Sequence, residues 1–112
     1  MAIVLISEQE LNMDENKPAY LVVDTAIENV ENYEEYKKLA MPIVEKFQGQ
    51  YLTRGGEMDV VQSELWSPTR IVIIKFPNHK YAKSFLESPE YNPVKKIRLS
   101  NSKATSIIVE GI

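Results

Sequence analysis

Arginine and paired glycines stand together at Arg54-Gly55-Gly56, within a segment that otherwise has the composition of a strand. Glycine amides left open beside a guanidinium could bind an anion, as the backbone nests of phosphate loops do. The alternative, which we favour, is a β-bulge with Arg54 paired to a carboxylate such as Asp24 or Glu64. No G-x-x-x-x-G-K or G-x-G-x-x-G motif follows a strand, so a bound nucleotide is not expected.

A second arginine, Arg70, opens a strongly apolar stretch and shares a strand face with Val72, Ile74 and Phe76. Its charge therefore points toward an otherwise apolar layer. A buried guanidinium requires a carboxylate partner or an anionic ligand. Both alternatives stand at this point, a structural ion pair and a site for a small organic anion, and the ion pair is favoured.

Three further side chains are candidates for a pocket or for proton transfer. Trp66 and Tyr91 could line a pocket with Arg70, although aromatic core packing is the favoured interpretation. His79 is the only histidine, so it alone has an unperturbed pKa near neutrality and could be a general base or a haem ligand. It stands beside Lys80 at the start of an expected helix, where solvated residues are common, and a surface role is favoured.

Metal and cofactor chemistry finds little support in the residue types. The chain has no Cys and one His, which excludes disulfides and thiolate sites, and no carboxylate spacing suits a zinc site. We expect neither a metal nor a cofactor. Four basic residues near the C-terminus form a cluster that we interpret as a solvated face, not a nucleic-acid contact, because the formal net charge is -3: Lys95, Lys96, Arg98 and Lys103.

The elements that must position these residues belong to one small domain. The chain has 112 residues, of which 44% are hydrophobic and 26% charged, as in ordinary globular proteins. Residues 1–18 include the polar stretch SEQELNMDENKP and are expected to be an N-terminal arm or linker, followed by a domain over 19–112. No segment resembles a membrane span or a signal peptide, so a cytoplasmic location without membrane contact is the default.

Hydrophobic periodicity predicts the order β-α-β-β-α-β, the split βαβ arrangement of ferredoxin-like folds. Strands are expected over 19–27, 50–53 resumed at 59–65, 69–76 and 105–110. The first helix follows an Asn29 or Asn32 cap and stops at Gly49. The second spans 79–87 after an Asn78 cap, and a further helical stretch runs from Ser88 to about residue 100.

The strands also carry information about assembly. Three apolar runs do not alternate with polar residues: Leu21-Val22-Val23, Ile71 to Ile74, and Ile107-Ile108-Val109. Antiparallel strands with one wet face alternate, so both faces of this sheet should be covered. Since the helices can cover only one face, we expect a twofold homodimer in which the sheet of a second copy covers the other.

Five short motifs follow one another along the chain: YLTRGG at 51–56, Leu65-Trp66, RIV at 70–72, FPN at 76–78 and SPEY at 88–91. In this combination the sequence resembles the uncharacterised family catalogued as domain of unknown function 1330 (DUF1330), from about Lys17 to Gly111. The resemblance implies an α+β fold, a ferredoxin-like protomer of a dimeric α+β barrel. The wider superfamily includes cofactor-free oxygenases, isomerases and haem-degrading enzymes, but the family itself has no established reaction, so none carries over.

Two classes of function follow from these residues. The first is a cofactor-independent enzyme that acts on a small anionic organic molecule, with Arg70 and Arg54 binding the anion and Tyr91 or His79 moving a proton. The second is a non-catalytic dimeric module that binds a small molecule or serves a structural role. A pocket beside Arg70 that also contains a proton-transferring group would favour the enzyme, whereas a closed interior would favour the module.

Overall fold

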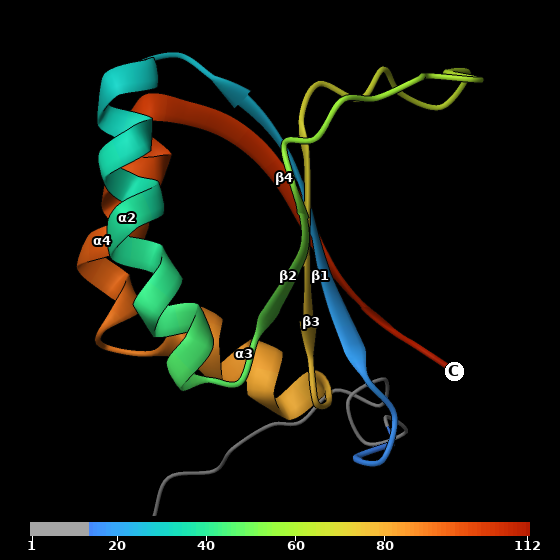
Figure 1. The fold of residues 1–112 in the computed structure, drawn as a ribbon, viewed down its shortest axis with the longest axis vertical. Coiled ribbons are helices and arrows are strands. Elements are labelled where there is room, and N and C mark those ends of the chain that lie inside the picture. Colours follow the sequence, from blue (N-terminus) through green and yellow to red (C-terminus); the bar gives the residue numbers. More distant parts are fainter. Residues whose placement is uncertain (1–13) are drawn as a thin grey trace, which may run out of the picture.

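The elements follow the order β-α-β-β-α-α-β in the computed structural model, which describes residues 14–112 (Figure 1). The strands are β1 (Ala19–Ile27), β2 (Gln50–Arg54), β3 (Ile71–Phe76) and β4 (Ser102–Glu110). The helices are α2 (Val30–Lys46), α3 (His79–Glu87) and α4 (Tyr91–Asn101). The predicted ferredoxin-like α+β fold is confirmed.

The N-terminal segment predicted over residues 1–18 lies mostly outside the described residues, so its assignment as an arm stays a prediction. The last residues of this segment lie beside the end of β4. The Asp14 amide donates to Glu110 Oε2 over 2.9 Å, and the Gly111 amide donates to the Pro18 carbonyl over 2.7 Å. The chain therefore enters β1 already bound to the strand beside it.

The four strands form one antiparallel sheet in the order β2-β3-β1-β4. Its register sorts the residues by face, because side chains alternate along a strand. Leu21 of β1 is paired with Ile74 of β3 and Ile108 of β4, and these three point toward the helices. All three helices lie on this one side of the sheet (Figure 1).

The opposite face of the sheet has no cover within the described chain. Val22 is paired with Ile73 on one side and Ile107 on the other, so three aliphatic side chains form a row across the middle of this outer face. Ile107 is 56% exposed and Val109 is 47% exposed. This arrangement is what the non-alternating strands predicted, an apolar face that the helices of the same chain cannot reach.

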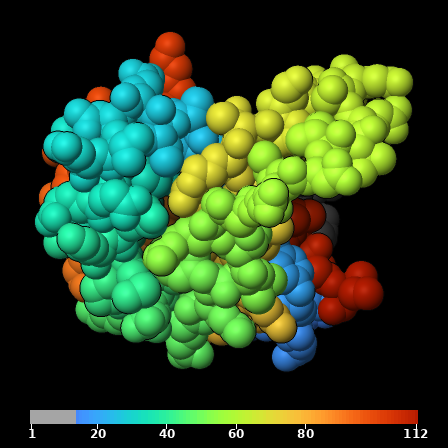
Figure 2. Space-filling view, turned by 45° about the horizontal axis from the view of Figure 1, so that its top comes forward, coloured from blue at the N-terminus to red at the C-terminus, as the bar shows by residue number. Residues whose placement is uncertain are grey.

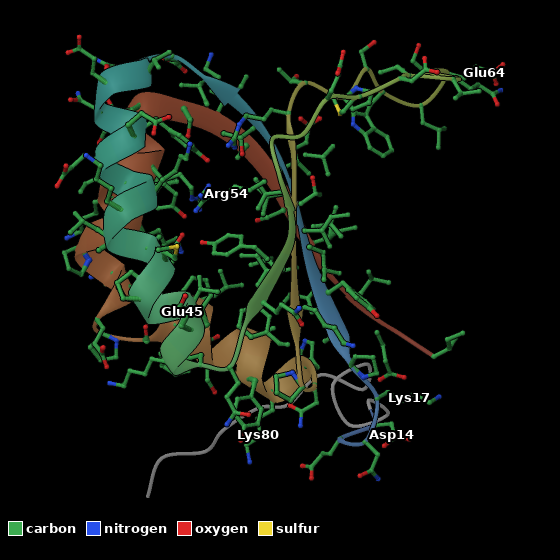
Figure 3. All side chains as sticks on the ribbon, in the orientation of Figure 1. Asp14, Lys17, Glu45, Arg54, Glu64 and Lys80 are labelled. Carbon is green, nitrogen blue, oxygen red and sulfur yellow. The ribbon has the colours of Figure 1, made fainter. Side chains whose placement is uncertain are left out.

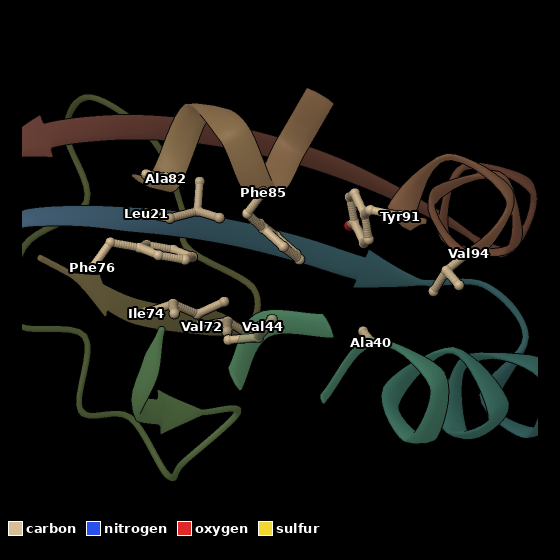
Figure 4. Packing of buried hydrophobic residues seen from close by; sticks show 10 residues of the cluster. All are labelled: Leu21, Ala40, Val44, Val72, Ile74, Phe76, Ala82, Phe85, Tyr91 and Val94. Carbon is tan, nitrogen blue, oxygen red and sulfur yellow. The ribbon is translucent and has the colours of Figure 1, made fainter. Parts of the chain in front are cut away.

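The core is formed where the helices meet the inner face of the sheet (Figure 4). Phe85 of α3 lies at its centre, with ring centroids 5.7 Å from Phe76 and 4.4 Å from Tyr91. Burial of large aromatic side chains is the main stabilising contribution in such a small domain. The cluster comprises Leu21, Ala40, Val44, Val72, Ile74, Phe76, Ala82, Phe85, Tyr91 and Val94.

Three polar side chains cap the helices, each as its sequence position indicated. Asn29 Oδ1 accepts the Asn32 amide at the start of α2, and Asn78 Oδ1 accepts the Tyr81 amide at the start of α3, both over 3.1 Å. Ser88 Oγ accepts the Tyr91 amide over 3.1 Å and so caps α4. These bonds satisfy amides that have no partner within their own helix.

The first helix was expected to stop at Gly49, and the left-handed conformation that ends many helices lies one residue earlier. That conformation belongs to Gln48, whose φ is 63°. Gly49 is required for another reason, because a Cβ atom there would lie 2.6 Å from Val44 Cγ1 and 2.8 Å from Phe76 Cε1. The glycine allows the chain to pass close to the core as it enters β2.

The prediction that β2 resumes over 59–65 is wrong, because the chain leaves the sheet at Gly55. Gly55 has a φ of 71°, which turns the backbone away after its amide donates to the Ile71 carbonyl over 2.9 Å. The register shift of a bulge occurs earlier, between Tyr51 and Thr53. Residues 56–69, hereafter the β2–β3 loop, stand away from the domain on the open side of the sheet (Figures 1 and 2).

Candidate functional site

A pocket lies between the inner face of the sheet and the helices. Its apolar part is formed by core side chains from the strands and from α2 and α3, among them Leu21, Ile74, Val44, Phe85 and Leu86. The cavity measures about 550 Å³ when the part open to solvent is included. It therefore offers an apolar wall on which the skeleton of a small organic molecule could lie.

The polar residues of the pocket are cations and phenols. Among the described residues that line it there is no aspartate, glutamate or histidine, whereas an apolar site with several cations usually balances them with carboxylates. The pocket is therefore electropositive and suited to an anion. The polar lining consists of Arg54, Arg70, Arg98, Lys37, Tyr33, Tyr36, Tyr51, Tyr91 and Ser106.

Arg70 directly precedes β3 and its side chain enters the pocket. Its backbone is held by a hydrogen bond on the outer face of the sheet. Asp24 Oδ1 on the outer face accepts the amides of Thr69 and Arg70 over 2.9 and 3.0 Å. The hydrogen bond from the Arg70 amide is the main cause that holds the pKa of Asp24 below its ordinary value. Asp24, predicted as a possible partner of the Arg54 side chain, thus binds the backbone of Arg70 instead.

The guanidinium of Arg70 has an aromatic partner instead of a carboxylate. It lies over the Tyr33 ring, with Cζ 5.3 Å from the ring centroid, and Nη1 is 3.5 Å from the Tyr33 hydroxyl. Within residues 14–112 no carboxylate oxygen lies within 4.0 Å of it. The structure therefore removes the ion-pair alternative for the described part of the chain.

Arg54 reaches the same pocket from β2. Its Cζ lies 5.0 Å from the centroid of the Tyr51 ring, and its side chain is seen between the sheet and the helices (Figure 3). The expected ion pair with Glu64 or Asp24 does not form. Glu64 lies near the far end of the β2–β3 loop (Figure 3), and Asp24 faces the other side of the sheet.

Arg98 is a pocket residue that sequence reasoning assigned to a solvated face. It is half-buried beside the Tyr91 hydroxyl. Burial alone would lower the pKa of Arg98, but the neighbouring hydroxyls of Tyr91, Tyr36 and Tyr33 outweigh it and raise this pKa, so the guanidinium stays charged. The basic pattern of the last helix concealed this role, since it does not show which basic residue turns inward.

The two phenols beside Arg98 contact each other. Tyr36 Oη of α2 and Tyr91 Oη of α4 are 2.7 Å apart, and their ring centroids are 6.4 Å apart. Burial is the main cause that raises the pKa of Tyr36, followed by the neighbouring Tyr91. The hydroxyl of Tyr36 therefore stays protonated and acts as a hydrogen-bond donor across the physiological pH range.

The structure brings Arg54, Arg70 and Tyr91 together but not the other predicted site residues. Trp66 is 59% exposed and donates from Nε1 to Asp24 Oδ2 over 3.0 Å, on the outer face of the sheet. His79 opens α3 and is not among the residues lining the pocket.

The glycines act through the backbone. The Gly55 amide is used in the bond to Ile71, so it is not open to a ligand as a nest would require. Instead Gly55 makes room for Arg70: a Cβ there would meet its guanidinium. Gly56 is exposed and lies outside the pocket lining.

Sequence reasoning missed the tyrosines of α2, although a signal for them exists. Tyr33 and Tyr36 stand three residues apart, on the same face of this helix as Ala40. A phenol on a buried face requires a partner for its hydroxyl, which could have indicated a polar site between helix and sheet. Tyr51 of β2, which is paired with Ile74, also points toward the helices.

Two classes of site are not found in the described part of the chain. Within residues 14–112 no group of three or more His, Asp or Glu side chains is placed to hold a metal ion. No helix in the same range is long and apolar enough to cross a membrane.

Comparison with solved structures places the fold. A Rhodopseudomonas palustris protein of unknown function, RPA0582, matches with a TM-score of 0.73 and 13% identity, over 100% of this chain and 98% of its own. SnoaB, a cofactor-independent oxygenase from Streptomyces nogalater, matches with a TM-score of 0.66 and 10% identity, over 86% and 94% of the two chains. A hypothetical Arabidopsis thaliana protein matches with a TM-score of 0.62 and 17% identity, over 85% and 88%.

These identities are low, so the matches show the fold alone, a ferredoxin-like α+β protomer. No curated protein matches the chain. The model of one family, described as a domain of unknown function (DUF1330), matches residues 18–112, which include every strand, helix and pocket residue described above. The chain belongs to the DUF1330 family.

Proposed function

We propose that the protein binds a small organic anion in the pocket between sheet and helices and acts on it as a cofactor-independent enzyme. The observation that carries this proposal is the charge of the lining. Arg54, Arg70 and Arg98 face one cavity, and within residues 14–112 none of them has a carboxylate within 4.0 Å. Guanidinium groups recognise carboxylates and phosphates with paired hydrogen bonds.

Two further facts support turnover as well as binding. The phenols of Tyr36 and Tyr91 place hydroxyl protons beside the arginines, where a reacting oxygen atom would lie. SnoaB, which shares the fold, is described as a cofactor-independent oxygenase. A catalytic role of Tyr91 rests on this proximity, whereas His79 stays a candidate without a place in the pocket.

The second candidate function is a binding module without a reaction. One observation favours it: among the described residues of the pocket lining, no carboxylate or imidazole is present to act as a general base. A phenol whose pKa is raised stays protonated, so it can donate a hydrogen bond but is not available as a general base. Under this alternative the same anion would bind and leave unchanged.

Binding is tested by calorimetric titration with benzoate as the first probe, followed by phosphate. We expect benzoate to bind the parent protein and the Arg70→Met variant to bind at least about tenfold more weakly, because a charge-assisted hydrogen-bond pair is lost. Lys80→Met is the matched control, since Lys80 is exposed on α3 and outside the pocket. Failure of both probes to bind the parent would overturn the proposal.

Turnover is tested on the acids that bind. The protein, freed of metals with a chelator, is incubated with each acid while dioxygen uptake and the mass of the products are followed. Consumption that depends on Arg70 supports the enzyme, whereas saturable binding without any change of the acid supports the binding module.

We also propose that the outer sheet face joins two copies in a homodimer. The fold is that of dimeric α+β barrels, and nothing among residues 14–112 covers the aliphatic row of Ile73, Val22 and Ile107. Two such faces bury the same residues against each other around a twofold axis, which is the usual symmetry of homodimers. The exposed β2–β3 loop rises on this same side of the sheet (Figure 1).

A further inference from the structure

The hydroxyl pair of Tyr36 and Tyr91 contains one more proton than it uses. Each hydroxyl carries a single proton, and the 2.7 Å contact between the two oxygens uses one of them. The neighbouring guanidinium of Arg98 offers donors only. Within residues 14–112 neither hydroxyl has another hydrogen-bond partner that could accept the second proton.

The spare proton belongs to Tyr36, as the burial of the two residues indicates. Tyr91 is 2% exposed, so the acceptor available to its proton is the Tyr36 oxygen, 2.7 Å away. Tyr36 is half-buried and lines the cavity. The chain of donors therefore runs from Tyr91 to Tyr36 and ends on a hydroxyl that lines the ligand space.

We propose that Tyr36 donates this hydrogen bond to a second oxygen of the bound anion. The ligand is then an organic acid that carries a phenol, enol or carbonyl oxygen in addition to the carboxylate at Arg70. This inference rests on the proposed function and specifies its ligand class.

The positions of the two ends support a ligand of this kind. The Arg70 guanidinium lies 5.3 Å from the Tyr33 ring, and the Tyr33 and Tyr36 rings are 5.2 Å apart. The Tyr33 ring thus neighbours both the Arg70 guanidinium and the Tyr36 ring along the pocket wall. A small skeleton that carries two oxygen groups suits two polar groups that flank one aromatic ring in this way.

The test compares benzoate with 3-hydroxybenzoate and 4-hydroxybenzoate by calorimetry on the full-length protein. We expect one hydroxybenzoate to bind the parent at least about tenfold more tightly than benzoate, as one hydrogen bond to a polar oxygen in a dry site allows. In Tyr36→Phe that preference should disappear, so that neither hydroxybenzoate binds the variant more tightly than benzoate binds the same variant. Tyr81→Phe is the control, because Tyr81 lies on α3 outside the pocket lining.

Each outcome separates this inference from the proposed function. Benzoate binding with no preference for either hydroxybenzoate, or a preference that survives Tyr36→Phe, overturns the role of Tyr36 and leaves the anion site standing. Binding by none of the three acids overturns both.

A measurement on the unaltered protein covers the case in which the variant fails to fold. The chromophore 4-hydroxy-3-nitrobenzoate should bind with its phenol ionised at a pH where the free dye is still protonated. An unchanged titration of the bound dye contradicts the hydrogen bond.

Discussion

Gly55 and Arg70 share a space that has no room for another side chain. A Cβ atom at position 55 would lie 2.5 Å from Nε of Arg70 and 2.8 Å from its Cζ. The glycine amide bonds to Ile71, the residue after the arginine, over 2.9 Å. The turn that ends β2 and the guanidinium in the pocket are therefore one structural unit.

Replacing Gly55 with alanine should destabilise the protein by about 1–3 kcal/mol, because the φ of 71° strains any L side chain and the added carbon meets Arg70. Benzoate affinity should fall with it, since the guanidinium must move. Gly56→Ala is the control: its Cβ would approach only Thr53 Oγ1, at 3.1 Å. Equal urea midpoints for the two variants would contradict this account.

Replacing Arg70 with methionine should change the free energy of unfolding by less than about 1 kcal/mol. Among the described residues no carboxylate within 4.0 Å would be left unpaired, and methionine suits the apolar neighbours. Thermal melts measure the change. A loss of roughly 3–5 kcal/mol, the cost of breaking a buried ion pair, would show that a carboxylate partner exists after all.

Asp24 should make stability depend on pH in the acid range. Its folded-state pKa lies below the ordinary 3.8, mainly through the Arg70 amide, so its contribution is fully present above about pH 4 and is lost as pH falls through the lowered pKa. Asp24→Asn should cost about 1 kcal/mol at neutral pH, because an amide presents fewer acceptors to the Thr69, Arg70 and Trp66 donors.

Urea titrations between pH 2 and pH 7 should show the stability of parent and Asp24→Asn converging toward acid. Glu45→Gln is a control, because Glu45 is an exposed carboxylate of α2. Parallel pH profiles for the parent and Asp24→Asn would contradict the role of this carboxylate.

The outer sheet face should lose its partner when a charge is placed in the aliphatic row. Ile107→Lys is expected to convert a dimer into a monomer at micromolar concentration, because an unpaired ammonium would be buried between two sheets. Leu99→Lys is the matched control: Leu99 of α4 is 59% exposed, close to the 56% of Ile107. A parent that sediments as a monomer would overturn the proposed homodimer.

The sequence predicted most of the fold because local signals and tertiary contacts agree. The bounds of β1 and α3 follow from β-branched runs and from an Asn78 cap, both short-range effects. The prediction failed at 59–65, where a strand-like composition is overridden by the turn at Gly55. A composition shows what a segment could form, but pairing requires a neighbouring strand with free backbone groups.

For the site, the sequence by itself determined that Arg70 faces an apolar layer, since strand alternation allows no other direction beside Val72 and Ile74. Only the tertiary structure decided what meets it. Asp24 lies on the opposite face of the sheet, where it binds the Arg70 amide and the Trp66 side chain. Tyr36 and Arg98 enter the pocket from helices that are distant in the sequence. Periodicity determines the face on which a side chain lies, whereas its partners depend on how separate elements pack, and no spacing within one element records that.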